Sequence, residues 1–244
     1  MKVDSIIAPV HKSLLKMELT EARFLRSTNK GHNEIYIVDA HNSPNVMWEI
    51  GRLREIAFRT SGGGTGKSAD IDEFDTMEEP CQQLIVWNPE AEEIKNGVPQ
   101  IAMSHMFGYS QEFLKEKLPY TLELGRSFVS VEYQSTKAGV KALYALDNLW
   151  DGLGALTVVY PNLKYFFGKM TMYPSYPHEC RNMILYFLDK YFHDNDRLVY
   201  PLHPLDARID EDKMRHIFTG STFREDYKIL NSMASISRRL STPI

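Results

Sequence analysis

The sequence predicts an α/β or α+β domain in which helices flank a mixed β-sheet. Strand-like and helix-like segments alternate along the 244 residues. One strand pattern, Glu34–Ala40, is separated from the next helical pattern only by a short turn. Hydrophobic residues make up 43% and charged residues 25%, as in ordinary soluble proteins. We expect an N-terminal helical arm over residues 1–30, a main domain over 31–205 and a helical C-terminal extension over 206–244.

Bulk composition narrows the functional class. The formal net charge is −4, which does not favour nucleic acid as a partner. The two cysteines, Cys81 and Cys180, form neither a disulfide framework nor a metal quartet. The N-terminus lacks the apolar run of a signal peptide, and no apolar stretch reaches about 20 residues. We therefore expect a cytoplasmic protein without a bound metal, and leave open peripheral contact with the inner face of the membrane.

The first elements follow from hydrophobic spacing. Residues 4–30 are expected to contain one amphipathic helix, because apolar side chains recur at about helical intervals: Leu14, Leu15, Leu19, Ala22 and Leu25. Alternatively, Thr20 and Glu21 would cap a second, shorter helix. The strand Glu34–Ala40 leads to a polar turn in which Ser43 or Asn45 would cap the helix Val46–Phe58.

A glycine-rich segment, Ser61–Ser68, superficially suggests a phosphate-binding loop. Such a loop needs glycine at the first of its eight positions, where this chain has Ser61, and it links a strand to a helix. Here a helical pattern precedes the segment and the acidic run Asp70–Asp75 follows it. We expect a flexible loop over a cleft instead, because glycine imposes little order on the backbone. The acidic run itself is either a solvated loop or a group that holds an amine or orients arginines.

Besides the segment Tyr120–Tyr133, the rest of the main domain is expected to contain two strands and three helices. The strand patterns are Gln82–Trp87 and Lys164–Tyr173, and the helical patterns are Ser110–Lys117, Gln134–Leu156 and Arg181–Phe192. His105 precedes the first of these helices and is a candidate acid or base, because imidazole titrates near neutral pH.

The segment Tyr120–Tyr133 organises the chain. It alternates like a strand, yet Glu123, Gly125 and Arg126 interrupt its apolar side chains. Glycine inside a strand often marks a bulge, and a bulge at Gly125 would bring Glu123 and Arg126 together. A structural ion pair in a half-buried strand is the plainer interpretation.

The run L-E-L-G-R-S-F-V, followed by E-Y-Q, resembles the haemolysin-like acyltransferases of the GNAT superfamily, which include the ornithine-lipid and glycine-lipid synthases. It is more distantly similar to the acyl-homoserine-lactone synthases. The resemblance covers roughly residues 49–192 and implies a GNAT-like fold. It also implies transfer of a 3-hydroxy fatty acyl group from acyl carrier protein, or acyl-CoA, to the amine of a small amino acid such as glycine or ornithine, the first step of aminolipid synthesis. No tightly bound cofactor is expected.

The resemblance also implies site residues. In the central strand, Glu123 would accept the amine proton, directly or through a water. Arg126 or Arg54 would bind the carboxylate of the acceptor, and the hydroxyl of Ser127 or backbone amides would hold the oxyanion. The substrate-binding candidates, which match an Arg followed by Phe-Arg and an Asp-x-Phe-Asp segment, are Arg54, Phe58, Arg59, Asp72, Phe74 and Asp75.

The resemblance also suggests a phosphate-binding region, and the sequence departs from the family pattern at one strand. The phosphopantetheine arm of the carrier would bind near Lys137, Gly139 and Lys141, where a single glycine remains of the usual loop, which weakens coenzyme A as the donor. The Gly-x-x-Arg pattern expected after Gln82–Trp87 is absent, so that strand is either remodelled or missing. The rival interpretations are a non-catalytic lipid- or carrier-binding protein and an acyl-homoserine-lactone-type synthase.

Overall fold

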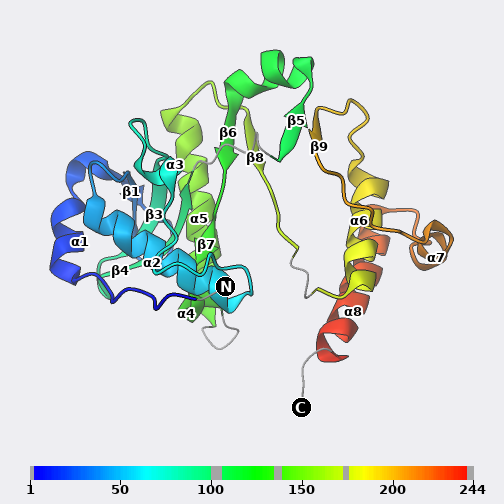
Figure 1. The fold of residues 1–244 in the computed structure, drawn as a ribbon, viewed down its shortest axis with the longest axis horizontal. Helices are drawn as coiled ribbons and strands as arrows, with labels where there is room; N and C mark the ends of the chain where they lie inside the picture. Colours follow the sequence, from blue (N-terminus) through cyan, green and yellow to red (C-terminus); the bar gives the residue numbers. More distant parts are fainter. Residues whose placement is uncertain (1–2, 100–105, 135–138, 173–175, 241–244) are drawn as a thin grey trace. The chain divides into compact units, whose positions relative to one another are not determined.

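The computed structural model describes residues 3–99, 106–134, 139–172 and 176–240, with the backbone alone at 95–99, 141, 146 and 234–240. These residues form two compact units (Figure 1). The first comprises residues 1–102 and 117–169, and the second comprises residues 103–116 and 170–244.

The first unit is built on a five-stranded antiparallel sheet. Its strands, in spatial order, are β1 (Phe24–Ser27), β2 (Glu34–Val38), β3 (Gln83–Asn88), β4 (Glu93–Pro99) and β7 (Phe128–Val129). The central pair, β2 and β3, is in register from Glu34 opposite Trp87 to Val38 opposite Gln83. Both strands read as nearly continuous apolar runs because both of their faces are covered.

Two long helices cover the two faces of this sheet. Alternate side chains of β2 and β3, such as Tyr36 and Ile85, pack with α2 (Pro44–Thr60). The intervening ones, such as Ile35 and Leu84, pack with Leu153 and Leu156 of α5 (Val140–Val159). This alternation is the two-residue period of a strand. It confirms the predicted α/β class, with helices flanking a sheet.

The predicted central strand is divided in two. β6 (Thr121–Leu124) leaves the large sheet and pairs in parallel with β8 (Tyr165–Gly168), whereas β7 pairs with β4. Residues 125–127 form the break, and Arg126 has a left-handed φ of +41°. After β7 the chain turns into the short helix α4 (Val131–Gln134), so the predicted strand ends earlier than Tyr133. The parallel β6–β8 pair makes the sheet system mixed, as predicted.

The N-terminal helix is shorter than predicted. Only α1 (Lys12–Glu18) is α-helical; a 3₁₀ turn, η1 (Glu21–Arg23), and the edge strand β1 follow it. The helix ends where Glu18 reaches another element, since its carboxylate accepts hydrogen bonds from the backbone amides of Asn45 and Val46 at the start of α2. The side chain of Glu18 thus caps α2, in place of the predicted Ser43 or Asn45. A carboxylate is stabilised there because the N-terminus of a helix carries a partial positive charge.

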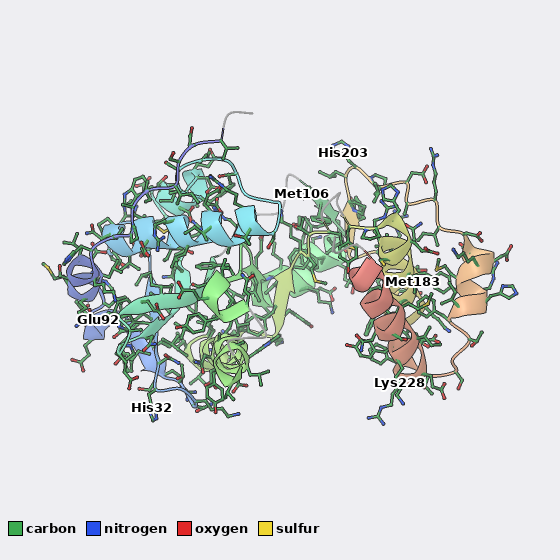
Figure 2. All side chains as sticks on the ribbon, turned by 90° about the horizontal axis from the view of Figure 1, so that it is seen from below. His32, Glu92, Met106, Met183, His203 and Lys228 are labelled. Carbon is green, nitrogen blue, oxygen red and sulfur yellow. The ribbon has the colours of Figure 1, made fainter. Side chains whose placement is uncertain are left out.

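The second unit is mainly helical. It contains β5 (Phe107–Tyr109) paired with β9 (Val199–Pro201), the π-helical turn η2 (Phe113–Lys117), α6 (His178–Phe192), α7 (Glu211–Ile217) and α8 (Phe223–Leu240). The 3₁₀ turn η3 (Leu118–Tyr120) then leads into β6. Met183, Phe187, Met214 and Phe218 form the core of the unit. Figure 2 shows Met183 between α6 and α8, and the exposed Lys228 on α8.

The buried carboxylate of Asp226 in α8 accepts hydrogen bonds from Lys190, Tyr191 and the backbone amide of Gly220, which ties α8 to α6. In the described part of the chain, no helix has the length and apolar character needed to cross a membrane.

Candidate active site

The break between β6 and β7 places Arg126 against three carboxylates. Its Nη1 donates to Asp75 Oδ2 at 3.1 Å and to Asp70 Oδ1 at 3.4 Å, and its Nη2 donates to Asp72 Oδ1 at 3.1 Å. The side chain keeps 14% of its surface exposed. A left-handed backbone is unfavourable for a non-glycine residue, so these three contacts stabilise a strained position.

A second arginine, Arg54, binds two of these aspartates from the buried side of the cluster. Arg54 of α2 is completely buried, and its Nη2 donates to Asp75 Oδ2 at 2.9 Å and to the carbonyl oxygen of Asp70 at 2.7 Å. The buried amide of Gln83, at the start of β3, donates to Asp75 Oδ1 at 3.2 Å. Asp75 therefore joins α2, β3 and the β6–β7 break at one carboxylate.

Local sequence explains why the acids are in place. Asp72 caps the short helix α3 (Glu73–Thr76) by accepting from the amide of Phe74, and Asp75 accepts from the amide of Asp72. This reciprocal capping box fixes both carboxylates. Asp70 and Asp75 are buried, and only Asp72 is substantially exposed, at 39% of its side chain. Asp70 and Asp75 therefore do not belong to a solvated loop, and the contacts of the acidic run show that it orients the two arginines.

Three carboxylates face two guanidinium groups in this cluster. Burial lowers the pKa of Arg126, but Asp75, Asp70 and Asp72 outweigh burial and leave that pKa raised. Burial raises the pKa of Asp70 more than Arg54 and Arg126 lower it. Burial likewise lowers the pKa of Arg54, against the effect of Asp75. With more acids than bases, the cluster attracts a positively charged group such as an ammonium.

Glu123 lies on the same side of β6 as this cluster. Its neighbours Leu122 and Leu124 pack with the α5-side core, so the alternation of the strand directs Glu123 to the other face. Burial raises the pKa of the Cys81 thiol, and the charges of Asp75, Asp72 and Glu123 raise it further. Glu123 thus acts on the same thiol as Asp72 and Asp75 of the cluster, and the raised pKa keeps that thiol protonated.

The other predicted residues are more scattered. Ser127 is exposed beside Arg126, and Phe74 is half-buried on α3. Phe58 packs against the core under α2. Arg59 pairs with Glu55 and donates to the carbonyl oxygens of Asp4 and Lys67, so its partners differ from those of Arg126.

Some predicted positions cannot be placed. His105 and Lys137 lie outside the described residues, as does the side chain of Lys141. Gly139 is described, and it precedes α5 with a φ of +55°. Within the described part of the chain, no group of three or more His, Cys, Asp or Glu side chains is arranged to hold a metal ion.

The glycine-rich loop, Ser61–Ser68, was predicted to be flexible, but hydrogen bonds hold it to α2. The buried carboxylate of Glu55 accepts from the amide and hydroxyl of Thr65, at 2.9 and 2.6 Å, and from the amide of Gly66 at 2.9 Å. The loop thus wraps around an internal carboxylate of α2. Loop composition alone could not reveal this contact.

Sequence reasoning missed two members of the cluster. Asp70 was visible only as part of an acidic run, without a role of its own, and Gln83 was hidden inside a strand pattern. A polar residue at the start of an otherwise apolar strand was the one available signal for Gln83.

One cavity of the first unit is built from other residues. It measures about 690 Å³ and is lined by residues 9–13, Leu15 and Lys16, by Glu49 and Arg52 of α2, and by Glu92 and Glu93. None of the predicted site residues lines it.

Known proteins share most of this sequence. Residues 53–144, which include Arg54, the acids and Arg126, match the family model of the acetyltransferase (GNAT) domain. The chain is 60% identical over 245 residues to the glycine N(alpha)-acyltransferase of Phocaeicola vulgatus, covering 94% of this chain and 75% of the relative. It is 61% identical over 245 residues to that of Bacteroides thetaiotaomicron, covering 94% and 73%. The chain therefore belongs to the GNAT family of N-acyltransferases and is an acyltransferase.

Proposed function

We propose that the enzyme transfers a 3-hydroxy fatty acyl group from acyl carrier protein to the amine of glycine, as the first step of aminolipid synthesis. The observation that carries the choice of acceptor is the 60–61% identity, over 94% of the chain, to two proteins named glycine N(alpha)-acyltransferase. The geometry around Arg126 supports the chemistry that such a transfer needs.

The acceptor arrives as a zwitterion. Its ammonium is attracted by the excess of carboxylates, of which Asp72 is the most accessible. Its carboxylate pairs with Arg126, whose side chain keeps 14% of its surface exposed, because Arg54 is completely buried. The Nε of Arg126 is buried and has no hydrogen-bond acceptor among the described residues, so the guanidinium has unused donor capacity.

Glu123 accepts a proton from the ammonium and frees the lone pair of the amine. The amine then attacks the thioester carbon, forming a C–N bond, and the C–S bond breaks to release the thiol of the carrier with one proton. The hydroxyl of Ser127, or backbone amides at the break, donate to the oxyanion that forms between these steps. This sequence needs no covalent acyl-enzyme.

The donor's phosphopantetheine phosphate is expected near the start of α5. A helix N-terminus favours an anion, and Lys137 and Lys141 would add positive charge there. Since the product is an amphiphile, we also propose that release takes place at the inner face of the membrane.

The test is an acylation assay. Purified protein is incubated with 3-hydroxyhexadecanoyl-acyl carrier protein and an equimolar mixture of amino acids, and products are read by mass spectrometry. N-acylglycine is expected as the main product. Glu123→Gln should lower kcat/KM about 10²–10⁴-fold, the usual contribution of a general base, while circular dichroism and unfolding stay close to wild type.

The matched control is Glu90→Gln, which makes the same change at an exposed position away from the cluster and should leave activity unchanged. Acylation of ornithine in preference to glycine, or full activity of Glu123→Gln, would contradict the proposal.

A further inference from the structure

A second cavity, of about 340 Å³, lies in the first unit at the start of β6. It is lined by Gln82, Pro119, Tyr120, Thr121, Leu122, Tyr160, Asn162 and Leu163. Three segments meet there: the residue before β3, the entry to β6, and the turn that joins α5 to β8. Its size lies at the lower end of the range for small-ligand sites, which is roughly 300–1,000 Å³.

The lining contains no charged side chain. Leu122 and Leu163 pack against the α5-side core, so the inner wall is apolar. Tyr120 and Tyr160 are 37% and 45% exposed and stand toward solvent. The ammonium of Lys164 lies over the ring of Tyr120, 4.2 Å from its centroid, but Lys164 is not among the lining residues. Such a cavity favours an uncharged, carbon-rich ligand over an amino acid or a phosphate.

The cavity is close to the proposed proton acceptor. Leu122 lines it and is the residue next to Glu123. Tyr120 is three residues from Glu123, a distance of roughly 10 Å at the rise of an extended strand. Side chains of Leu122 and Glu123 point to opposite faces of β6, and β6 pairs only with β8 among the described strands. Along the chain, the cavity lining thus comes within one residue of the proposed proton acceptor.

We propose that this cavity receives the distal part of the donor's fatty acyl chain and that Tyr160 limits the chain length. The inference rests on the proposed function for the class of donor. Tyr160 follows the last turn of α5, and its backbone amide donates to Leu156 while its carbonyl accepts from Leu163. Because its ring is half-exposed, its size can change without repacking the core, which is not true of Leu122.

The experiment compares donors within a single preparation. Wild type, Tyr160→Trp and Tyr160→Ala are each given 3-hydroxydodecanoyl- and 3-hydroxyhexadecanoyl-acyl carrier protein together, with glycine as acceptor. The ratio of kcat/KM for the long donor to that for the short donor is measured. This ratio does not depend on the fraction of folded enzyme. Tyr160→Trp should lower the ratio by about tenfold or more, and Tyr160→Ala should raise it, because small changes in an apolar pocket alter selectivity by 10–200-fold.

The matched control is Val158→Trp, which adds more bulk than Tyr160→Trp two residues earlier, at a position that is 80% exposed and does not line the cavity. It should keep the wild-type ratio. An unchanged ratio in both Tyr160 variants, or the same shift in Val158→Trp, would overturn the inference while leaving the proposed function standing. Absence of N-acylglycine from wild type with either donor would instead overturn the proposed function.

Discussion

At the scale of single residues, Asp75 holds the site together. Its buried carboxylate accepts from Arg54, Arg126 and Gln83, and from the amide of Asp72. Asp75→Asn removes a charge that two guanidinium groups share. Breaking a buried ion pair in this way costs about 3–5 kcal/mol. We expect the urea-unfolding free energy to fall by that amount, and kcat/KM to fall as well because Arg126 loses its anchor.

The control for this substitution is Asp147→Asn. Asp147 is half-exposed and pairs with Lys30 across 3.4 Å at the surface. Exposed pairs contribute about 0–1 kcal/mol, so this variant should unfold like wild type. Equal stability of the two variants would show that the Asp75 carboxylate does not carry the cluster.

The residues of the site could be predicted from the sequence to different degrees. Glu123 and Arg126 were apparent because charge and glycine interrupt an apolar strand, which packing alone does not explain. Arg54, Asp72 and Asp75 were found only through resemblance. Their positions depend on long-range contacts between α2, α3 and the β6–β7 break, and local patterns do not encode such contacts.

At the scale of elements, α2 must pack closely on the segment that carries the acids. A Cβ on Gly51 would lie 2.5 Å from Ile71 Cγ1 and 3.3 Å from the carbonyl oxygen of Asp70. Gly51→Ala therefore pushes the acidic segment away from Arg54. Overpacking costs about 1–3 kcal/mol, against a gain of about 1 kcal/mol in helix propensity. We expect a lower melting temperature and lower activity.

Gly154→Ala is the matched change in the other long helix. Nothing lies within 4 Å of a Cβ at Gly154, and the position is exposed. Only the propensity gain remains, so this variant should be more stable than wild type by up to about 1 kcal/mol. Calorimetry of both variants tests the pair, and stabilisation by Gly51→Ala would refute the packing argument.

Element boundaries show what local patterns leave out. The hydrophobic spacing of residues 4–30 predicted one helix, but Glu18 caps α2 and residues 24–27 join the edge of the sheet. Tertiary contacts overrode helix propensity there. The helix α2 was predicted almost to its ends, because a polar turn precedes it and the glycine-rich loop follows it.

At the scale of the whole molecule, the fold class followed from the alternation of strands and helices, and the structure confirms it. The two compact units did not follow, because the second unit combines residues 103–116 with residues 170–244. The pairing of β5 with β9 joins segments about 90 residues apart, as the register Phe107 to Pro201 shows. Sequence periodicity carries no information on such a pairing.

Both units contain a buried carboxylate that makes stability depend on pH. Burial would raise the pKa of Glu55, but hydrogen bonds from Thr65 and Arg59 outweigh burial and lower it. Burial would likewise raise the pKa of Asp226, but hydrogen bonds from Lys190 and Tyr191 lower it. A carboxyl group with a lowered folded pKa contributes stability above its unfolded pKa of roughly 4, and that contribution is lost as pH falls through the folded value.

Acid should therefore destabilise the protein, and the loss should be traceable to single carboxylates. Asp70 acts in the opposite direction, because its raised pKa favours the protonated native state, and it offsets part of the loss. We expect the urea midpoint of wild type to fall between about pH 5 and pH 3. Glu55→Gln should start lower at pH 6 and fall less steeply, because it has no such carboxylate to protonate. Glu90→Gln, exposed and away from the cluster, should follow the wild-type slope. Parallel slopes for wild type and Glu55→Gln would mean that the glycine-rich loop is not held by an ionised Glu55.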